Sequence, residues 1–198
     1  VAFRIAPRLN AAGRMGHAGE AVELLSTADG ARANELATFL DQQNNLRRDV
    51  EKTITAQALE MVESRGLNHP DNRTIVLASS DWHGGVIGIV ASRMVDRFHR
   101  PSVLIGINDE GFGQGSGRSV RGFNLVNAIR ACEGHLLSCG GHAMAAGLRM
   151  KQANFDAFAA AFEAYARENS NEEQLAPPLD IDAETTFAAL DQSTVRTI

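Results

Sequence analysis

The segment 31–65 predicts one continuous helix, and its length limits the possible folds more than any other feature of the chain. At a rise of about 1.5 Å per residue, such a helix reaches about 50 Å, which exceeds the width of a small domain. A helix this long normally bridges two domains, so we expect a separate unit at each end. Asp29 or Gly30 would start it and Gly66 would end it. Its apolar positions fall mostly on one face: Leu36, Phe39, Leu40, Val50, Ile54, Ala58, Leu59 and Val62.

After residue 72 the pattern changes to alternating strands and helices. The turn residues at 108–111 predict a hairpin between two of these strands. The fold class expected from this order is α/β, a small mixed β-sheet domain with flanking helices, preceded by a long linking α-helix. Residues 1–16 show no strong period, and 19–27 predict a short helix. The elements expected after 72 are strands 73–78, 102–107, 111–118 and 143–150, and helices 84–98, 124–131 and 154–168.

These elements predict a chain whose two ends are cut from a longer protein. We expect 1–18 to be the end of a preceding domain, 19–70 a helical linker, 71–169 the α/β domain, 170–178 a proline-containing linker and 179–198 the start of a further domain. No run approaches the ~20 apolar residues of a membrane span. Two cysteines give no disulfide framework, so we expect a reducing, cytoplasmic location.

Two glycine-rich segments, 113–119 and 139–147, indicate recognition of a phosphate. Half of the 18 glycines fall between 111 and 147. Residues without Cβ atoms let the backbone approach a ligand, and Arg118 and nearby serines offer donors to a phosphate oxygen. The alternative is a hairpin plus a tight turn that serve packing alone. No Gly-Lys pair occurs, as a P-loop needs, and the Rossmann glycine spacing fails, which argues against both of these nucleotide-binding folds.

The charge distribution favours a local anion site over a broad basic surface. The chain has a net charge of −5, yet residues 1–16 and 111–150 each carry +3. Only Lys52 and Lys151 of the 19 basic residues are lysine, and the planar arginine fork suits bidentate phosphate contacts. The positive charge therefore lies where the glycines are and at the amino-terminal end.

Three motifs in order resemble the DHH-associated domain of the RecJ family. Members of this family are single-strand-specific 5′ to 3′ DNA exonucleases of the DHH phosphoesterase superfamily. The motifs are Ala-Ser-Ser-Asp-Trp-His-Gly-Gly from 78, Gly-Ser-Gly-Arg-Ser at 115–119 and Gly-Gly-His-Ala-Met-Ala-Ala-Gly at 140–147. Residues 7–14, Pro-Arg-Leu-Asn-Ala-Ala-Gly-Arg, resemble the end of the DHH catalytic domain. The resemblance implies that the long helix links the two core domains and that an oligonucleotide-binding fold starts near 179.

The resemblance also implies a nuclease of DNA repair and recombination that uses two Mn²⁺ or Mg²⁺ ions. The family's Asp-His-His triplet is absent, and Asp81-Trp82-His83 is the nearest approach to it. We therefore expect the metal ligands outside this chain, no catalytic or metal-binding residue within it, and no nuclease activity from this piece alone. Its share would be to hold single-stranded DNA, with other repair proteins as further partners and no membrane contact.

The resemblance assigns phosphate binding to eight positions: Arg14, Ser116, Gly117, Arg118, Ser119, Gly140, Gly141 and His142. Six more could contact the strand: Arg8, Asn10, Trp82, His83, Arg121 and Phe123. Trp82 and His83 could stack on a base. Asp81 could instead serve as a simple helix N-cap.

Other readings remain open at this stage. Cys132, His135, Cys139 and His142 have zinc-ligand spacing, although two reduced core cysteines are the preferred interpretation. The polar stretches 41–45 and 47–51 are expected to be solvated, as is the helix side that carries Arg93, Arg97 and Arg100.

The function could also be that of a DHH phosphodiesterase acting on short RNA or cyclic dinucleotides, or of a non-catalytic nucleic-acid-binding module.

Overall fold

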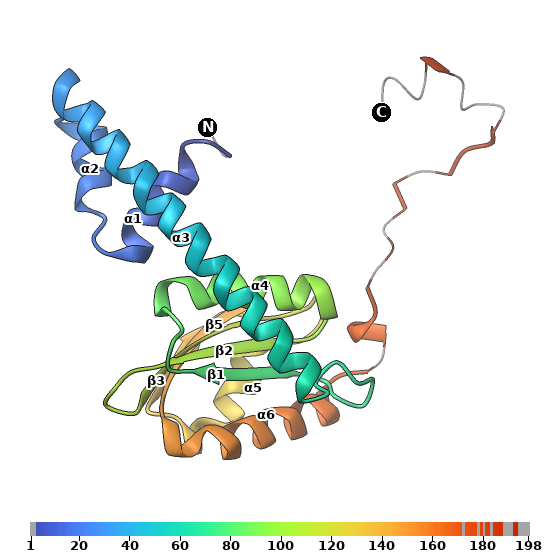
Figure 1. Cartoon of the computed structure of the whole chain (residues 1–198). Helices are drawn as coiled ribbons and strands as arrows, with labels where there is room; N and C mark the ends of the chain where they lie inside the picture. The colour runs from blue at the N-terminus through green and yellow to red at the C-terminus, as the bar shows by residue number, and fades with distance from the viewer. Residues whose placement is uncertain are drawn as a thin grey trace.

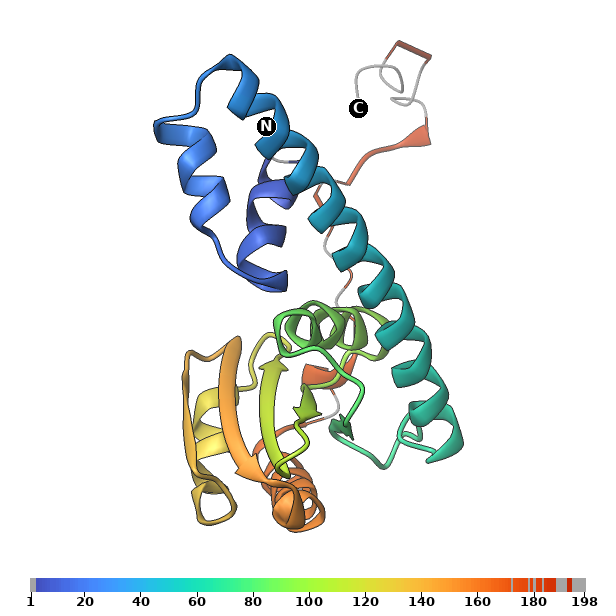
Figure 2. The same cartoon turned by 60° about the vertical axis from the view of Figure 1, so that its left-hand side comes forward.

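The protein consists of a helical unit and an α/β unit, which helix α3 (Gly30–Ser64) joins, as Figure 1 shows. The computed structural model describes residues 3–171, 173–177, 179, 181–182, 184–187 and 192–193. Helices α1 (Ala6–Met15) and α2 (Gly19–Ser26) pack beside the first part of α3 (Figure 2). The rest of α3 lies along the α/β unit. Much of the expected linker and further domain at 170–198 lies outside the described residues.

Helix α3 confirms the expected long helix almost to the residue. The carboxylate of Asp29 caps it by accepting a hydrogen bond from the Arg32 backbone N–H at 2.9 Å. The helix stops before Gly66, whose φ of +64° suits glycine. Its apolar face is buried, but so are Asn44 and Glu51, which are 6% and 5% exposed. The expectation of a solvated polar middle is therefore wrong for these two residues.

The sheet has the order β1-β2-β3-β5-β4 and confirms the mixed α/β fold class. The pair β1–β2 is parallel and the other three pairs are antiparallel. The parallel pair is joined by helix α4. The strands are β1 (Ile75–Ser79), β2 (Ser102–Ile107), β3 (Phe112–Arg118), β4 (Ser138–Gly141) and β5 (Ala145–Lys151).

Helices cover the two faces of the sheet with separate apolar cores. Helix α4 (Gly84–Phe98) lies with α3 on one face, and α5 (Leu125–Ala131) and α6 (Phe155–Asn169) lie on the other (Figure 1). Phe158 and Phe162 of α6 are fully buried, and each such side chain contributes about 1.5–3 kcal/mol by leaving water. Short 3₁₀ turns occupy Glu133–His135, Gln152–Asn154 and Glu173–Leu175. No helix in the described part of the chain is long and apolar enough to span a membrane.

Two elements were not foreseen. Residues 6–15 form α1 although the segment has no clear period, because Pro7 suits the first turn and Ala11 and Ala12 are buried in contact with the rest of the unit. Strand β4 is missing from the expected strands, because its glycines weaken the strand signal. Strand β1 begins at Ile75 rather than at residue 73.

Candidate nucleic-acid interface

Arg118, the last residue of β3, is a half-buried cation that forms no ion pair with the described carboxylates. Its Nη1 donates to the Gly117 carbonyl oxygen at 2.7 Å and to Ser116 Oγ at 3.1 Å. Burial and, second, the positive charge of Arg14 hold the pKa of Arg118 below its usual value. An arginine nevertheless stays protonated. A bound anion would therefore relieve the repulsion between the two guanidinium groups.

Arg14 reaches Arg118 from the other unit because α1 ends directly on the start of α4. Its Nη1 donates to the Gly85 carbonyl oxygen at 3.1 Å. A Cβ at Gly85 would lie only 2.0 Å from the Arg14 carbonyl oxygen. Only glycine permits this approach, so Gly85 brings the two arginines together.

Gly88, one turn along α4, makes room for the side chains of β3. A Cβ there would lie 2.8 Å from Ser116 Oγ and 3.0 Å from Arg118 Nη2. Sequence reasoning missed Gly85 and Gly88 as parts of the site, although their spacing places them on neighbouring positions of one helix face. We call Arg14, Gly85, Gly88, Ser116 and Arg118 the two-arginine site.

The other glycines of β3 serve packing. Gly113, Gly115 and Gly117 alternate with the site residues and point to the opposite face of the sheet. A Cβ at Gly115 would lie 2.7 Å from Leu148 Cδ1, and one at Gly117 would lie 3.0 Å from Leu125 Cδ2. The assignment of Gly117 as a phosphate-binding residue is thus limited to its backbone, and the packing alternative explains much of the glycine content of this segment.

The Gly-Gly-His turn joins the site from the neighbouring strands. Gly141 has φ +146°, and a Cβ there would lie 2.5 Å from the Ala145 carbonyl oxygen. The exposed His142 donates its backbone N–H to the same oxygen at 2.8 Å. Gly140 pairs with Gly147, and Gly147 pairs with Ser116. This row therefore ends at the two-arginine site.

A groove of about 300 Å³ lies over the row. It is lined among others by Gln114, Ser138, Gly140, Gly147 and Arg149. Gly140 is exposed, and a Cβ on it would meet nothing within 4 Å. No side chain therefore covers the backbone at Gly140, and the exposed Arg149 adds a positive charge to the groove.

Three residues that were predicted to contact DNA are buried and cannot reach a DNA strand. Trp82 is 4% exposed, and its indole Nε1 donates to Gln57 Oε1 at 2.8 Å. Ser119 is 5% exposed, and its hydroxyl donates to the Phe123 carbonyl oxygen at 2.8 Å. Phe123 is 3% exposed and packs edge-to-face on Phe162. Stacking by Trp82, a DNA contact by Phe123 and a phosphate contact by the Ser119 hydroxyl are therefore wrong expectations.

The remaining candidates come from α1, the start of α4 and the loop after β3. His83, not Asp81, caps α4, since its Nδ1 accepts from the Gly85 N–H at 3.1 Å. Arg8 forms an ion pair with Asp41 of α3 at 2.7 Å, which already uses its charge. Asn10 on α1 and Arg121 in the loop after β3 are exposed.

Two of the three arginines expected on a solvated helix side are engaged. Arg93 Nε donates to Glu51 Oε1 at 2.7 Å. Arg100 is half-buried and donates to the Asn72 carbonyl oxygen at 2.6 Å, and burial lowers its pKa. Arg93 stays exposed in spite of this bond, as does Arg97, whose guanidinium lies 5.7 Å from the ring centre of Phe98.

The described residues do not fit a metal centre. Within them, no three His, Cys, Asp or Glu side chains lie close enough to hold an ion. Burial raises the pKa of Cys132 to about 11, which keeps the thiol protonated, whereas zinc binds the thiolate. Cys132 is buried and Cys139 packs half-buried against the same core.

Comparison with known proteins gives the class of this unit. Residues 71–168 match the DHHA1 domain. The chain is 48% identical over 133 residues to the single-stranded-DNA-specific exonuclease RecJ of Bacillus subtilis, covering 67% of this chain and 16% of that protein. RecJ of Thermus thermophilus is 42% identical over 166 residues, covering 84% of this chain and 23% of that protein. The α/β unit is therefore a DHHA1 domain.

A solved structure agrees with the sequence relatives. The crystal structure of Thermus thermophilus RecJ in complex with Mg²⁺ matches with a TM-score of 0.76 at 41% identity, over 84% of this chain and 25% of that one. The chain belongs to the RecJ family, which confirms the resemblance seen in its sequence. It spans less than a quarter of the length of these two curated relatives.

Proposed function

We propose that this chain is the strand-holding part of a single-stranded-DNA-specific 5′ to 3′ exonuclease. The observation that carries the proposal is the meeting of Arg14 and Arg118 over the glycines of α4. Neither guanidinium forms an ion pair with a carboxylate within the described part of the chain. The relatives' names, which state a single-stranded-DNA-specific exonuclease, support the proposal.

The chemistry fits recognition of the sugar-phosphate backbone. Two guanidinium groups and the Ser116 hydroxyl offer donors of the kind that hold phosphate oxygens without reading the bases. Such contacts would place the strand in register independently of its sequence, as an exonuclease requires. The bare row from Gly140 to Ser116 would let the strand lie close to the sheet.

The hydrolytic step would belong to a part of the enzyme that this chain does not include. RecJ structures have been solved in complex with Mg²⁺ and with manganese, so we propose divalent metal ions for the full enzyme. The ions would activate water, and the residues of this chain would hold the phosphate in position for attack. A cytoplasmic role in DNA repair and recombination, with other repair proteins as partners, is part of the same proposal.

A double-mutant cycle tests whether the two arginines hold one phosphate. Binding of labelled single-stranded DNA to this chain would be measured for Arg14→Ala, Arg118→Ala and the double variant. If both groups contact one phosphate, each single variant weakens binding, and the double variant loses less than the sum of the two losses. Unchanged binding in all three variants would contradict the proposal.

A further inference from the structure

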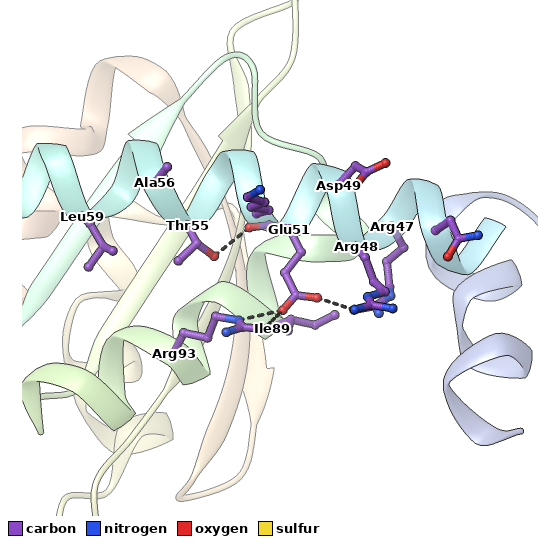
Figure 3. Close-up of a pocket in the computed structure, with 11 residues that line it drawn as sticks. Arg47, Arg48, Asp49, Glu51, Thr55, Ala56, Leu59, Ile89 and Arg93 are labelled. Carbon is purple, nitrogen blue, oxygen red and sulfur yellow. Dashed lines mark hydrogen bonds and ion pairs between the residues drawn. The ribbon is translucent and has the colours of Figure 1, made fainter. Parts of the chain in front are cut away.

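A crevice of about 860 Å³ lies between α3 and α4 (Figure 3), and the residues that line it include none of the two-arginine site. Ile89 and Arg93 of α4 line it, whereas Gly85, one turn before Ile89, contacts Arg14, and Gly88 contacts Ser116 and Arg118. Four cationic side chains line it: Arg47, Arg48, Lys52 and Arg93. The proposed function uses none of them.

Glu51 fixes the positions of two of these cations, Arg47 and Arg93, by hydrogen bonds. Its buried carboxylate accepts hydrogen bonds from Arg47 of its own helix and from Arg93 Nε of α4, the latter at 2.7 Å (Figure 3). Arg47 Nη2 also donates to Asn44 Oδ1 at 3.2 Å. Guanidinium groups fixed in this way lose little freedom when they bind a further acceptor.

The crevice still carries an excess of positive charge. Its lining holds the four cations against two carboxylates, Glu51 and Asp49, in a chain whose net charge is −5. Arg48 and Lys52 are exposed and form no ion pair within the described residues. Arg47 Nε is buried and has no acceptor there. The exposed side chains of Arg48 and Lys52 therefore offer unused donors at the crevice.

We propose that this crevice is a second site for the phosphate of a nucleotide. The arginine and lysine donors match phosphate oxygens. Leu59 and Ile89 add an apolar wall that a sugar or base can cover. The nucleotide could belong to a longer single strand or be a free mononucleotide, and both present the same phosphate chemistry. The site requires neither Arg14 nor Arg118, so it stands or falls separately from the proposed function.

The test is a titration of the isotope-labelled chain, followed by the amide chemical shifts of residues 45–55 and 89–93. The probes are inorganic phosphate, thymidine monophosphate and an oligonucleotide of about twelve thymidylates. The expected result is a saturable shift at these amides with both nucleotide probes, stronger than with inorganic phosphate. A higher affinity for the oligonucleotide than for the mononucleotide assigns the site to a DNA strand, and equal affinity assigns it to a free nucleotide.

Exposed positions supply variants that keep the fold. Arg48→Gln and Lys52→Gln should each weaken binding at the crevice by about three- to ten-fold, at an unchanged melting temperature. Lys151→Gln, an exposed lysine at the end of β5, is the matched control and should change nothing. Arg118→Ala should leave the shifts at the crevice intact. The proposal is overturned by the absence of a saturable shift at these amides, or by equal losses in Lys52→Gln and Lys151→Gln.

Discussion

The carbonyl oxygen of Arg14 occupies the space in which a side chain at Gly85 would stand. A Cβ there would lie 2.0 Å from that oxygen, far inside contact distance. Gly85→Ala should therefore push α1 away from α4, break the hydrogen bond from Arg14 Nη1 and weaken single-strand binding. Thermal unfolding and strand binding measure the two effects. Gly30→Ala, in the first turn of α3, is the control, since a Cβ there meets nothing within 4 Å and stability should hold or rise slightly.

Arg118 should be the main single contributor to strand binding. Arg118→Ala removes a charge-assisted contact and should cost about 1.5–3 kcal/mol of binding free energy, and Arg118→Lys should restore only part of it. The loss should be similar for different DNA sequences and should reduce the salt dependence of binding. Arg97→Ala, on an exposed helix side, is the control. Equal losses in Arg97→Ala and Arg118→Ala would contradict the assignment.

The chain by itself should not digest DNA in the presence of Mn²⁺ or Mg²⁺. Its described residues hold no group of potential ligands that could bind an ion. Labelled single-stranded DNA incubated with the purified chain should remain intact on a gel. Digestion that a chelator abolishes would show that this expectation is wrong.

The Cys132 thiol should make stability fall at high pH. Burial raises its pKa from 9.0 to about 11, so the folded chain keeps a proton that the unfolded chain releases earlier. The thiol's contribution to the free energy of unfolding is complete below about pH 9 and is lost as the pH rises through 11. Denaturant unfolding of the wild type and of Cys132→Ala measures this. The difference between them should shrink between these two pH values, and a constant difference would count against a buried, protonated thiol.

Glu51 should contribute strongly to the contact between α3 and α4. Glu51→Gln removes the buried carboxylate that pairs with the largely buried Arg47 and with the exposed Arg93, which should cost at most about 3–5 kcal/mol of unfolding free energy. Glu35→Gln is the comparison, because the Glu35 ion pair with Arg32 is exposed and worth at most about 1 kcal/mol. Chemical denaturation of both variants distinguishes the two cases, and similar small losses would show that the buried pair matters little.

Most of the fold could be predicted because local signals agree with the final packing. Helix α4 begins at Gly84 and ends at Phe98, as its glycines and apolar period indicate. Helix α1 and strand β4 could not be predicted, because contacts with distant parts of the chain stabilise them more than their own sequences do.

The candidate site shows where sequence reasoning stops. Residue type pointed to Arg118 and Arg14, but it could not tell that Trp82, Ser119 and Phe123 face inward. Nor could it tell that α1 would rest on α4, because this contact depends on the missing Cβ of Gly85, far along the chain from Arg14. Which side chains converge is decided by the packing of helices on the sheet.

Helix α3 is long enough to act as a lever. A rotation of about 5° at one end of a rod of about 50 Å moves the other end by about 4 Å, more than the length of a hydrogen bond. Helices α1, α3 and α4 touch one another pairwise, so they close a triangle of which α3 is one side. A triangle resists a rotation that a single rod would permit. The distance between Arg14 and Arg118 is therefore braced mechanically, without a large interface between the two units.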